Sequence, residues 1–423
     1  MSDTIFALSS GTPPAGIAVI RISGPQADAA LRQVAGRLPP VRRATLATLR
    51  DGAGGILDEA LVVRFAGPAS ATGEDLAELH CHGGRAVIAA VLAELASLPG
   101  LRAAEPGEFT RSAFANGRID LVEAEGLADL LSAETELQRR AALASAGGAM
   151  SRQIEQWREA VLALSATVEA VLDFGDEGDV ADLPANFAQR CGAFAEELAQ
   201  WLDRPRAEPL REGFRVVLAG PPNAGKSSLF NALIDSEAAI TSPVAGTTRD
   251  LIERPVSISG IPFIFVDTAG LHEGTGDAIE RIGISRARKA VDIADLVLWL
   301  GPAADCPADS WQVQSRADVD PAIRSARHRV SAKTGEGLAQ LKRDLVSHAA
   351  RALPQPGEAA LNARQAAHLA TCHQRIDAAA VVGDPLLAAE ELRLARRALD
   401  QLTGRASTED MLDALFCRFC IGK

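Results

Sequence analysis

The chain has 423 residues, of which 47% are hydrophobic, and a formal net charge of −12. This length is enough for two to four domains. The negative charge argues against a protein that coats nucleic acid through bulk positive charge. The six scattered cysteines do not form a disulfide framework, so we expect reduced thiols. With no basic leader and no run of about 18 apolar residues, we expect a cytoplasmic protein that does not associate with membranes.

The first predicted unit ends near Gly117. It contains the strand-like runs IAVIRIS and ALVVRF, and glycine and proline residues punctuate the turns between them. We therefore expect a separate N-terminal α/β domain over residues 1–118.

Two stretches rich in Ala, Leu and Glu flank the middle of the chain. In the first, apolar residues recur at spacings of three and four, which predicts one face of a long amphipathic helix. These residues are Ile154, Trp157, Val161, Leu164, Val168 and Val171. A similar composition returns after Pro356. We expect residues 119–212 and 351–423 to be two halves of one helical domain that meet in space.

The middle of the chain, residues 213–350, alternates short apolar runs with polar loops. The runs are FRVVLAG, IPFIFVDTAG, ADLVLWL and RHRVSAK. This alternation is typical of a mainly parallel α/β sheet. The expected fold class is therefore multidomain α+β, with an α/β domain inserted into the helical domain.

The stretch GPPNAGKS, residues 220–227, matches the phosphate-binding pattern GxxxxGK[ST]. It follows the strand-like FRVVLA and precedes the helix-like SLFNALI, which is the context that a P-loop requires. Lys226 is expected to reach the terminal phosphates, and the Ser227 hydroxyl to bind magnesium. The candidate nucleotide-binding residues here are Asn223, Ala224, Gly225, Lys226, Ser227 and Ser228.

Two further stretches fit a nucleotide switch. DTAG, comprising Asp267, Thr268, Ala269 and Gly270, follows an apolar strand and offers a carboxylate near magnesium. Between it and the P-loop lie Ser242 and the stretch GTTRD, and Ser242, Thr247 and Thr248 are candidate nucleotide-binding residues. We expect Thr248 to close over the magnesium ion.

Guanine is usually read by the Asp of an Asn-Lys-x-Asp pattern. The corresponding stretch here is Ser315-Arg316-Ala317-Asp318, so only the carboxylate remains. We expect Asp318 to select guanine, Arg316 to stack on the base, and Ser315 to be too short to reach the phosphate loop. SAKTGEGL is similar to the last guanine-contacting loop, through Ser331, Ala332 and Lys333. These features predict GTP and GDP as ligands.

Blocks at both ends of the chain resemble the MnmE family, also called TrmE, of tRNA modification GTPases. They include DTIFALSSGTPPAGIAVIRISGP, TGEDLAELHCHGG, PGEFTRSAFANGRIDLVEAEGLADLL and the terminal FCIGK, alongside GTTRD and DTAGL in the middle. The resemblance implies a folate-binding and dimerising N-terminal domain, a helical domain, and an inserted Ras-like P-loop G domain. It also implies a homodimer that forms a heterotetramer with the FAD-containing protein MnmG.

The activity that this resemblance implies is modification of carbon 5 of the wobble uridine in certain tRNAs, with GTP hydrolysis. The one-carbon unit comes from a tetrahydrofolate derivative, in its 5,10-methylene or 5-formyl form. By matching position, the folate is bound by Arg21, Glu78, Arg118 and Lys423. A carboxylate can accept two hydrogen bonds from a pterin ring, and cations can meet a glutamate tail.

The resemblance further implies a potassium ion that takes the place of an arginine finger when two G domains meet. Its ligands by matching position are Asn223, Ser242, Val244 and Thr247. Glu280 is the implied catalytic residue, orienting the attacking water through a second water. This role matters because Leu271 stands where many small GTPases have a water-orienting glutamine.

Two other functions are also compatible with the sequence. One is a ribosome-assembly or RNA-binding GTPase with the same switch core, and the other is a folate-dependent one-carbon transferase with a regulatory GTPase. Two pairs of residues could also be metal ligands: His80 with His82, and Cys417 with Cys420. A turn or packing role is favoured for the histidine pair. A packed helix end is favoured for the cysteine pair, because no second pair and no nearby His completes a metal site there.

Overall fold

A computed structural model describes residues 3–174, 183–235, 238–239, 252–268, 288–320, 326–355, 357–406 and 409–423. The chain divides into two compact units. The first comprises Met1–Ala128, Ser151–Glu155 and Asp400–Lys423, and the second comprises Asp129–Met150 and Gln156–Leu399. The two ends of the chain thus belong to one unit. None of the helices in the described ranges combines the length and apolar composition needed to cross a membrane.

The first unit contains a six-stranded sheet in the order β3-β4-β5-β2-β1-β6. Only β1 and β6 pair in parallel, and the other neighbours are antiparallel. The strands are β1 (Thr4–Leu8), β2 (Ile17–Ser23), β3 (Thr45–Arg50), β4 (Ile56–Phe65), β5 (Leu76–His82) and β6 (Leu101–Ala103). The predicted strand IAVIRIS coincides with β2, and ALVVRF lies within β4.

Helices α1 (Ala27–Ala35) and α2 (Arg85–Ser97) cover one face of this sheet. Side chains alternate between the two faces of a strand. Ile20, Val62 and Leu79 lie in the core beneath the two helices. Their sequence neighbours Arg21, Leu61 and Glu78 therefore point to the opposite face, where the site residues predicted on β2 and β5 meet.

The C-terminal segment packs against the N-terminal part of the same unit. Residues of α4 (Leu121–Ser132) and α14 (Glu409–Phe416) share a small apolar core, and α3 (Glu108–Ala115) lies beside α14. Gly422 has a φ of 92°, and a Cβ there would lie 2.2 Å from the Leu8 carbonyl oxygen. Only glycine allows this close approach of the last residues to β1.

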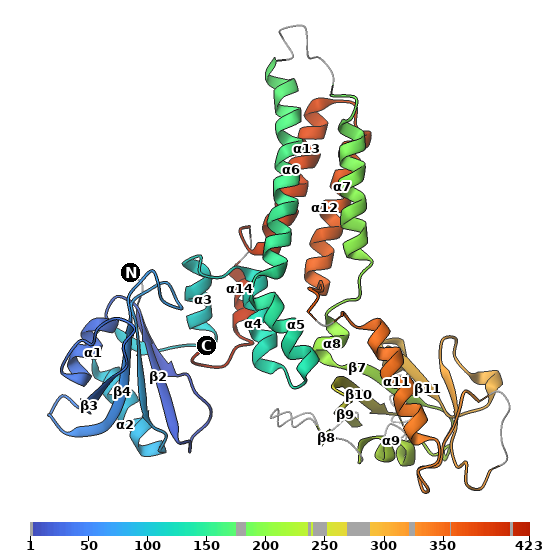
Figure 1. The fold of residues 1–423 in the computed structure, drawn as a ribbon, viewed down its shortest axis with the longest axis horizontal. Helices are drawn as coiled ribbons and strands as arrows, with labels where there is room; N and C mark the ends of the chain where they lie inside the picture. The colour runs from blue at the N-terminus through green and yellow to red at the C-terminus, as the bar shows by residue number, and fades with distance from the viewer. Residues whose placement is uncertain are drawn as a thin grey trace, which may run out of the picture. The chain divides into compact units, whose positions relative to one another are not determined.

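Long helices form a bundle in the second unit (Figure 1). They are α6 (Ala149–Phe174), α7 (Phe187–Leu202), α12 (Ala363–Val381) and α13 (Pro385–Thr403). Trp157 on α6 meets Trp201 on α7 edge to face, with ring centroids 5.3 Å apart. Helix α7 packs along α12, so the two halves of the helical domain meet as predicted.

The inserted domain has a seven-stranded sheet in the order β13-β12-β11-β7-β10-β9-β8. Its strands are β7 (Phe214–Ala219), β8 (Ala238–Ala239), β9 (Ile252–Ile258), β10 (Ile261–Asp267), β11 (Leu296–Trp299), β12 (Trp311–Gln314) and β13 (His328–Arg329). Pairing is parallel from β10 through β7 and β11 to β13, and antiparallel for β8 and β9. The predicted multidomain α+β fold class, with its inserted P-loop α/β domain, is confirmed.

Four shorter helices also lie in the described part of the second unit. They are α5 (Glu136–Ala146), α8 (Glu208–Glu212), α9 (Lys226–Ile234) and α11 (Leu338–Ala352). Leu137 and Ala141 of α5 pack against the core of the inserted sheet, and Gln138 Nε2 donates to the Arg211 carbonyl at 3.1 Å. Because β7 begins two residues after α8 ends, this contact lies at the entrance to the inserted domain.

Candidate functional site

The P-loop lies where the sequence predicts it, between β7 and α9. Its backbone turns through two glycines and one asparagine with positive φ: Gly220 at 147°, Asn223 at 59° and Gly225 at 89°. This turn directs the chain into the N-terminus of α9, where unpaired backbone NH groups favour an anion. The geometry therefore suits a phosphate group.

Lys226 is buried at 3% exposure, and its ammonium group is held within the loop. Nζ donates to the carbonyls of Gly220 at 3.0 Å and Pro221 at 2.9 Å. Burial lowers the pKa of Lys226, while the charge of Asp267 acts in the opposite direction. A buried cation that is held by the carbonyls of Gly220 and Pro221 is well placed to exchange them for phosphate oxygens.

Asp267 and Thr268 end the strand beside the P-loop. Asp267 pairs with Leu218 in the parallel register of β10 and β7, and both Asp267 and Thr268 are buried. The Thr268 hydroxyl donates to the Leu218 carbonyl at 2.8 Å, which fixes the end of β10 to β7. Ser227 is exposed at the start of α9. Its hydroxyl and the Asp267 carboxylate are hard oxygen donors of the kind that magnesium takes.

A pocket of about 300 Å³ lies beside the P-loop. Gly225 and Ser228 line it from the P-loop side, and Asp318, Ser331, Ala332 and Lys333 line it from two later loops. The Ser331 hydroxyl donates to Asp318 Oδ1 at 2.8 Å, and this hydrogen bond lowers the pKa of Asp318. Asp318 is thus an ionised acceptor with a fixed orientation, which suits the two donors of guanine.

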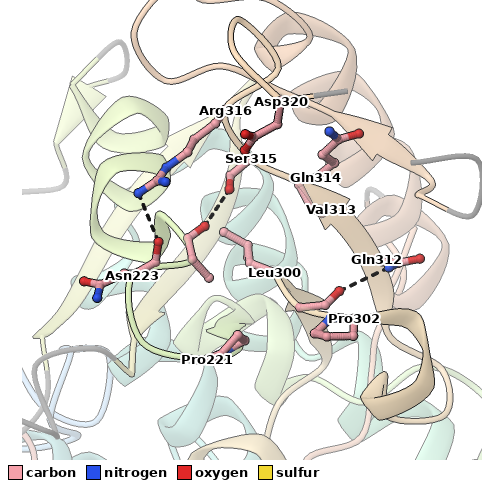
Figure 2. Close-up of a pocket in the computed structure, with 12 residues that line it drawn as sticks. Pro221, Asn223, Leu300, Pro302, Gln312, Val313, Gln314, Ser315, Arg316 and Asp320 are labelled. Atoms are coloured by element: carbon pink, nitrogen blue, oxygen red, sulfur yellow. Dashed lines mark hydrogen bonds between the residues drawn. The ribbon is translucent and has the colours of Figure 1, made fainter. Parts of the chain in front are cut away.

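Ser315 does reach the phosphate loop, so our expectation for this residue was wrong. Its hydroxyl donates to the Ala224 carbonyl at 2.5 Å. Arg316 Nη2 donates to the Asn223 carbonyl at 3.1 Å. Dashed lines mark the hydrogen bonds of Ser315 and Arg316 in Figure 2. The reach of a side chain depends on the separation of the two backbones, and here the loops lie close enough for serine.

Several predicted site residues lie outside the described residues. They are Ser242, Val244, Thr247, Thr248, Ala269, Gly270 and Glu280. The described half of the nucleotide site therefore consists of the P-loop, the end of β10 and the two loops that face the base.

Arg21 and Glu78 form a cross-strand ion pair on β2 and β5. Arg21 Nη2 donates to Glu78 Oε1 at 2.8 Å, and the guanidinium carbon lies 5.7 Å from the centre of the Phe109 ring of α3. His80 Nε2 lies 3.3 Å from the other Glu78 oxygen. Burial raises the pKa of Glu78, but the hydrogen bond and charge of Arg21 outweigh it, and the net pKa is lowered.

The other two predicted folate residues lie in the same unit. At Gly73, a Cβ would come within 3.2 Å of Arg118 Cγ and 2.7 Å of Asn116 Cβ. Asn116 Nδ2 also donates to the Thr72 carbonyl at 2.8 Å, so the turn that holds Arg118 is fixed to the loop before β5. Lys423 follows Gly422, which packs on the end of β1.

The two possible metal pairs have other surroundings. His82 Nδ1 lies 2.7 Å from Asp58 Oδ1, while His80 contacts Glu78. Cys417 and Cys420 are exposed free thiols just after the end of α14, so the expected packing of these two side chains was wrong. In the part of the chain that the structure describes, no group of three or more His, Cys, Asp or Glu side chains is placed to hold a metal ion.

The P-loop, the carboxylate at the end of β10 and the base-facing Asp318 define a G-domain protein of the P-loop class. Residues 4–118 match the model described as the GTP-binding protein TrmE N-terminus, and residues 121–420 match that of the MnmE helical domain. The chain belongs to the MnmE, or TrmE, family of tRNA modification GTPases.

Similar full-length proteins support this assignment. The tRNA modification GTPase MnmE of Novosphingobium aromaticivorans is 62% identical over 437 aligned residues, covering 100% of both chains. That of Erythrobacter litoralis is 60% identical over 423 residues, again covering 100% of both chains. That of Rhizorhabdus wittichii is 59% identical and covers 100% of this chain and 97% of the relative.

Proposed function

We propose that this protein is a potassium-dependent GTPase that acts in modification of the wobble uridine of certain tRNAs. The observation that supports the nucleotide assignment most strongly is the pairing of two features in one site. The buried Lys226 marks the phosphate end, and Asp318, held by Ser331 at 2.8 Å, marks the base end. Full-length relatives with tRNA modification GTPase in their names support the biological role.

In this proposal the P-loop amides and Lys226 hold the phosphates, and Asp318 accepts from guanine. Ser227 and Thr248 hold magnesium, which neutralises phosphate charge. Asn223, Ser242, Val244 and Thr247 hold potassium, which supplies positive charge to the transition state. Glu280 orients the attacking water through a bridging water, because the Leu271 side chain has no hydrogen-bonding group.

We further propose that the N-terminal domain binds a tetrahydrofolate derivative through Arg21, Glu78, Arg118 and Lys423. In support, Arg21 and Glu78 touch each other on the sheet face not covered by α1 and α2. A pterin ring would compete with Arg21 for the Glu78 carboxylate. The folate would supply a one-carbon unit in the 5,10-methylene or 5-formyl form for attachment at carbon 5 of the uridine.

We propose a homodimer that forms a heterotetramer with an FAD-containing protein of the MnmG type. An apolar cross-strand pair supports the dimer: Leu46 and Leu61 are 61% and 47% exposed. Domain boundaries are proposed after residues 118, 212 and 350, since the matched N-terminal region ends at 118 and β7 begins at Phe214. Because the substrate is tRNA, we place the activity in the cytoplasm.

The proposal is tested first by GTP hydrolysis with the full chain in potassium and in sodium chloride. We expect faster hydrolysis in potassium, and loss of activity in Lys226→Ala under both conditions. Mass spectrometry of wobble nucleosides from cells lacking the protein, complemented with wild type, Lys226→Ala or Glu78→Ala, then tests the tRNA role. Equal rates in the two salts would refute the potassium dependence, and unchanged wobble nucleosides in the deletion strain would refute the tRNA role.

A further inference from the structure

Residues 29–50 carry five arginines and no carboxylate, in a chain whose formal net charge is −12. All five side chains are exposed, and no described carboxylate forms an ion pair with any of them: they are Arg32, Arg37, Arg42, Arg43 and Arg50. An acidic protein that contacts nucleic acid needs arginine or lysine charge concentrated at one place. This segment supplies such a concentration.

Three of these arginines lie at the start of β3, an edge strand of the six-stranded sheet (Figure 1). Arg42 and Arg43 lie just before the strand, and Arg37 Nη2 donates to the carbonyl of Leu46 within it. Among the described strands β3 pairs only with β4, so no further strand of this sheet covers its outer edge. We refer to Arg37, Arg42 and Arg43 as the arginine cluster.

Two of the three side chains in the cluster are held by uncharged groups. The Arg42 guanidinium carbon lies 5.6 Å from the centre of the Phe65 ring, and Arg42 Nη2 donates to the Ala69 carbonyl. Arg37 is held by the Leu46 carbonyl. A carbonyl does not neutralise a guanidinium group, and each of these hydrogen bonds uses only part of its fork of NH donors. The cluster is therefore positive, partly oriented and able to donate further hydrogen bonds.

Carboxylates on the neighbouring segments bind other groups. The Arg42 amide donates to the Arg64 carbonyl at 2.8 Å, and the Arg64 side chain is paired with Asp28, with Nε 2.6 Å from Oδ1. Asp75 Oδ1 accepts from the Gly67 amide at 3.0 Å. Neither carboxylate is paired with the cluster, so the charge of the cluster is available to an external anion.

We propose that the arginine cluster, together with Arg32 on the adjacent helix α1, is a contact surface for the phosphate backbone of tRNA. A guanidinium group can donate two parallel hydrogen bonds to one phosphate. Phosphate contacts position a nucleic acid without reading its sequence, so this surface holds the tRNA while other residues act on the wobble base. The inference rests on the proposed role in tRNA modification.

Charge on an edge strand also has a simpler use, because it keeps strands of other molecules from pairing there. Charge of either sign serves that purpose, whereas phosphate binding requires positive charge. Replacement of Arg42 and Arg43 by glutamate therefore separates the two roles. The edge stays charged, but the attraction for phosphate becomes repulsion.

The test measures binding of the full-length protein to a fluorescently labelled tRNA transcript with an unmodified wobble uridine, by anisotropy over a series of potassium chloride concentrations. For Arg42→Glu with Arg43→Glu, we expect the dissociation constant to rise by about tenfold or more, and the slope of log K against log salt to become shallower by about 2. Arg42→Gln with Arg43→Gln should show a similar change of slope with a smaller loss of affinity. GTP hydrolysis without tRNA and the melting temperature should match those of wild type.

The matched control is Arg396→Glu with Arg397→Glu, which makes the same change of net charge at two consecutive exposed arginines on α13. Its dissociation constant for tRNA should stay within about twofold of wild type, because charge that does not touch the tRNA is largely screened by salt. An equal loss of affinity in the control would show that net charge, and not this surface, governs binding, and would overturn the proposal.

Absent or salt-independent binding of tRNA by the wild-type protein would also overturn the surface, as would unchanged affinity in both the glutamate and the glutamine variants. A glutamate variant that binds tRNA normally but no longer associates with the purified MnmG-type FAD protein would assign the cluster to an acidic protein and refute the RNA contact. Unchanged wobble nucleosides in the deletion strain would instead refute the proposed function itself.

Discussion

At the scale of single residues, the Arg21–Glu78 pair makes the stability of the N-terminal sheet depend on pH. A carboxyl group whose pKa is lowered by folding stabilises the fold above its unfolded pKa and loses that effect as pH falls through the folded pKa. For Glu78 the ordinary value is 4.5 and the folded value is lower. The stabilisation should therefore be complete at pH 7 and disappear in strongly acidic solution.

We predict that Glu78→Gln destabilises β2 and β5 by roughly 0.5–1 kcal/mol at pH 7, the range for a partly exposed ion pair. Hydrogen exchange of peptides from these strands in the full-length protein, measured at pH 7, 5 and 3.5, should show the difference from wild type shrinking as pH falls. Glu59→Gln, an exposed carboxylate on the neighbouring strand, is the control. A difference that grows towards low pH would contradict the assigned sign.

Motif order places several predicted site residues in a definite structural context. Lys226 and Asp267 follow from strand–loop–helix patterns, and the structure places Lys226 at the start of α9 and Asp267 at the end of β10. Ser315 shows the limit of such reasoning. Its side chain is short, but the contact with Ala224 depends on how closely two backbones approach, and no local pattern encodes that distance.

At the scale of elements, periodicity predicts the long helix α6 and the strands with uninterrupted apolar runs. Strand β12 was not among the predicted strands. All four of its residues are buried, yet Gln312 and Gln314 interrupt the apolar pattern. Residues 300–310, which lead from β11 to the parallel β12, contain only a short 3₁₀ turn at Ala303–Asp305. The connection between two parallel strands usually contains an α-helix, and a helical pattern between residues 300 and 310 would have indicated that a parallel strand follows. No such pattern precedes β12.

The contact of α6 with α7 should carry much of the stability of the helical bundle. Trp157 is 1% exposed, meets Trp201 edge to face, and donates from Nε1 to Glu197 at 2.9 Å. We predict that Trp157→Ala lowers the free energy of unfolding of the bundle by about 3–5 kcal/mol. Urea unfolding followed by circular dichroism is the measurement. Leu162→Ala, on the same helix at 39% exposure, should change stability by less than about 1 kcal/mol.

At the scale of the whole molecule, the sequence predicts the insertion of the α/β domain. We predict that residues 351–423 are the second half of the helical domain, and the match to the MnmE helical domain extends to residue 420. In the structure Asp400–Lys423 also pack in the unit that contains the N-terminal sheet, so the exact boundaries stay a prediction. This packing depends on contacts between residues far apart in the sequence. Pro106 and Ile421 form an isolated antiparallel bridge, and Gly107 approaches Phe416 so closely that a Cβ would lie 2.2 Å from its carbonyl oxygen.

The sheet face that α1 and α2 leave open offers a test of the proposed homodimer. Leu46 and Leu61 are direct neighbours on β3 and β4, and apolar side chains this exposed in a pair indicate a contact surface. We predict that Leu46→Asp with Leu61→Asp shifts the full-length protein from dimer to monomer, because the two copies would bring four carboxylates together in an apolar interface. Light scattering after size-exclusion chromatography measures the mass. Leu143→Asp, on α5 at 51% exposure, is the control and should leave the mass unchanged. A doubly substituted protein that stays dimeric at micromolar concentration would place the dimer contact elsewhere.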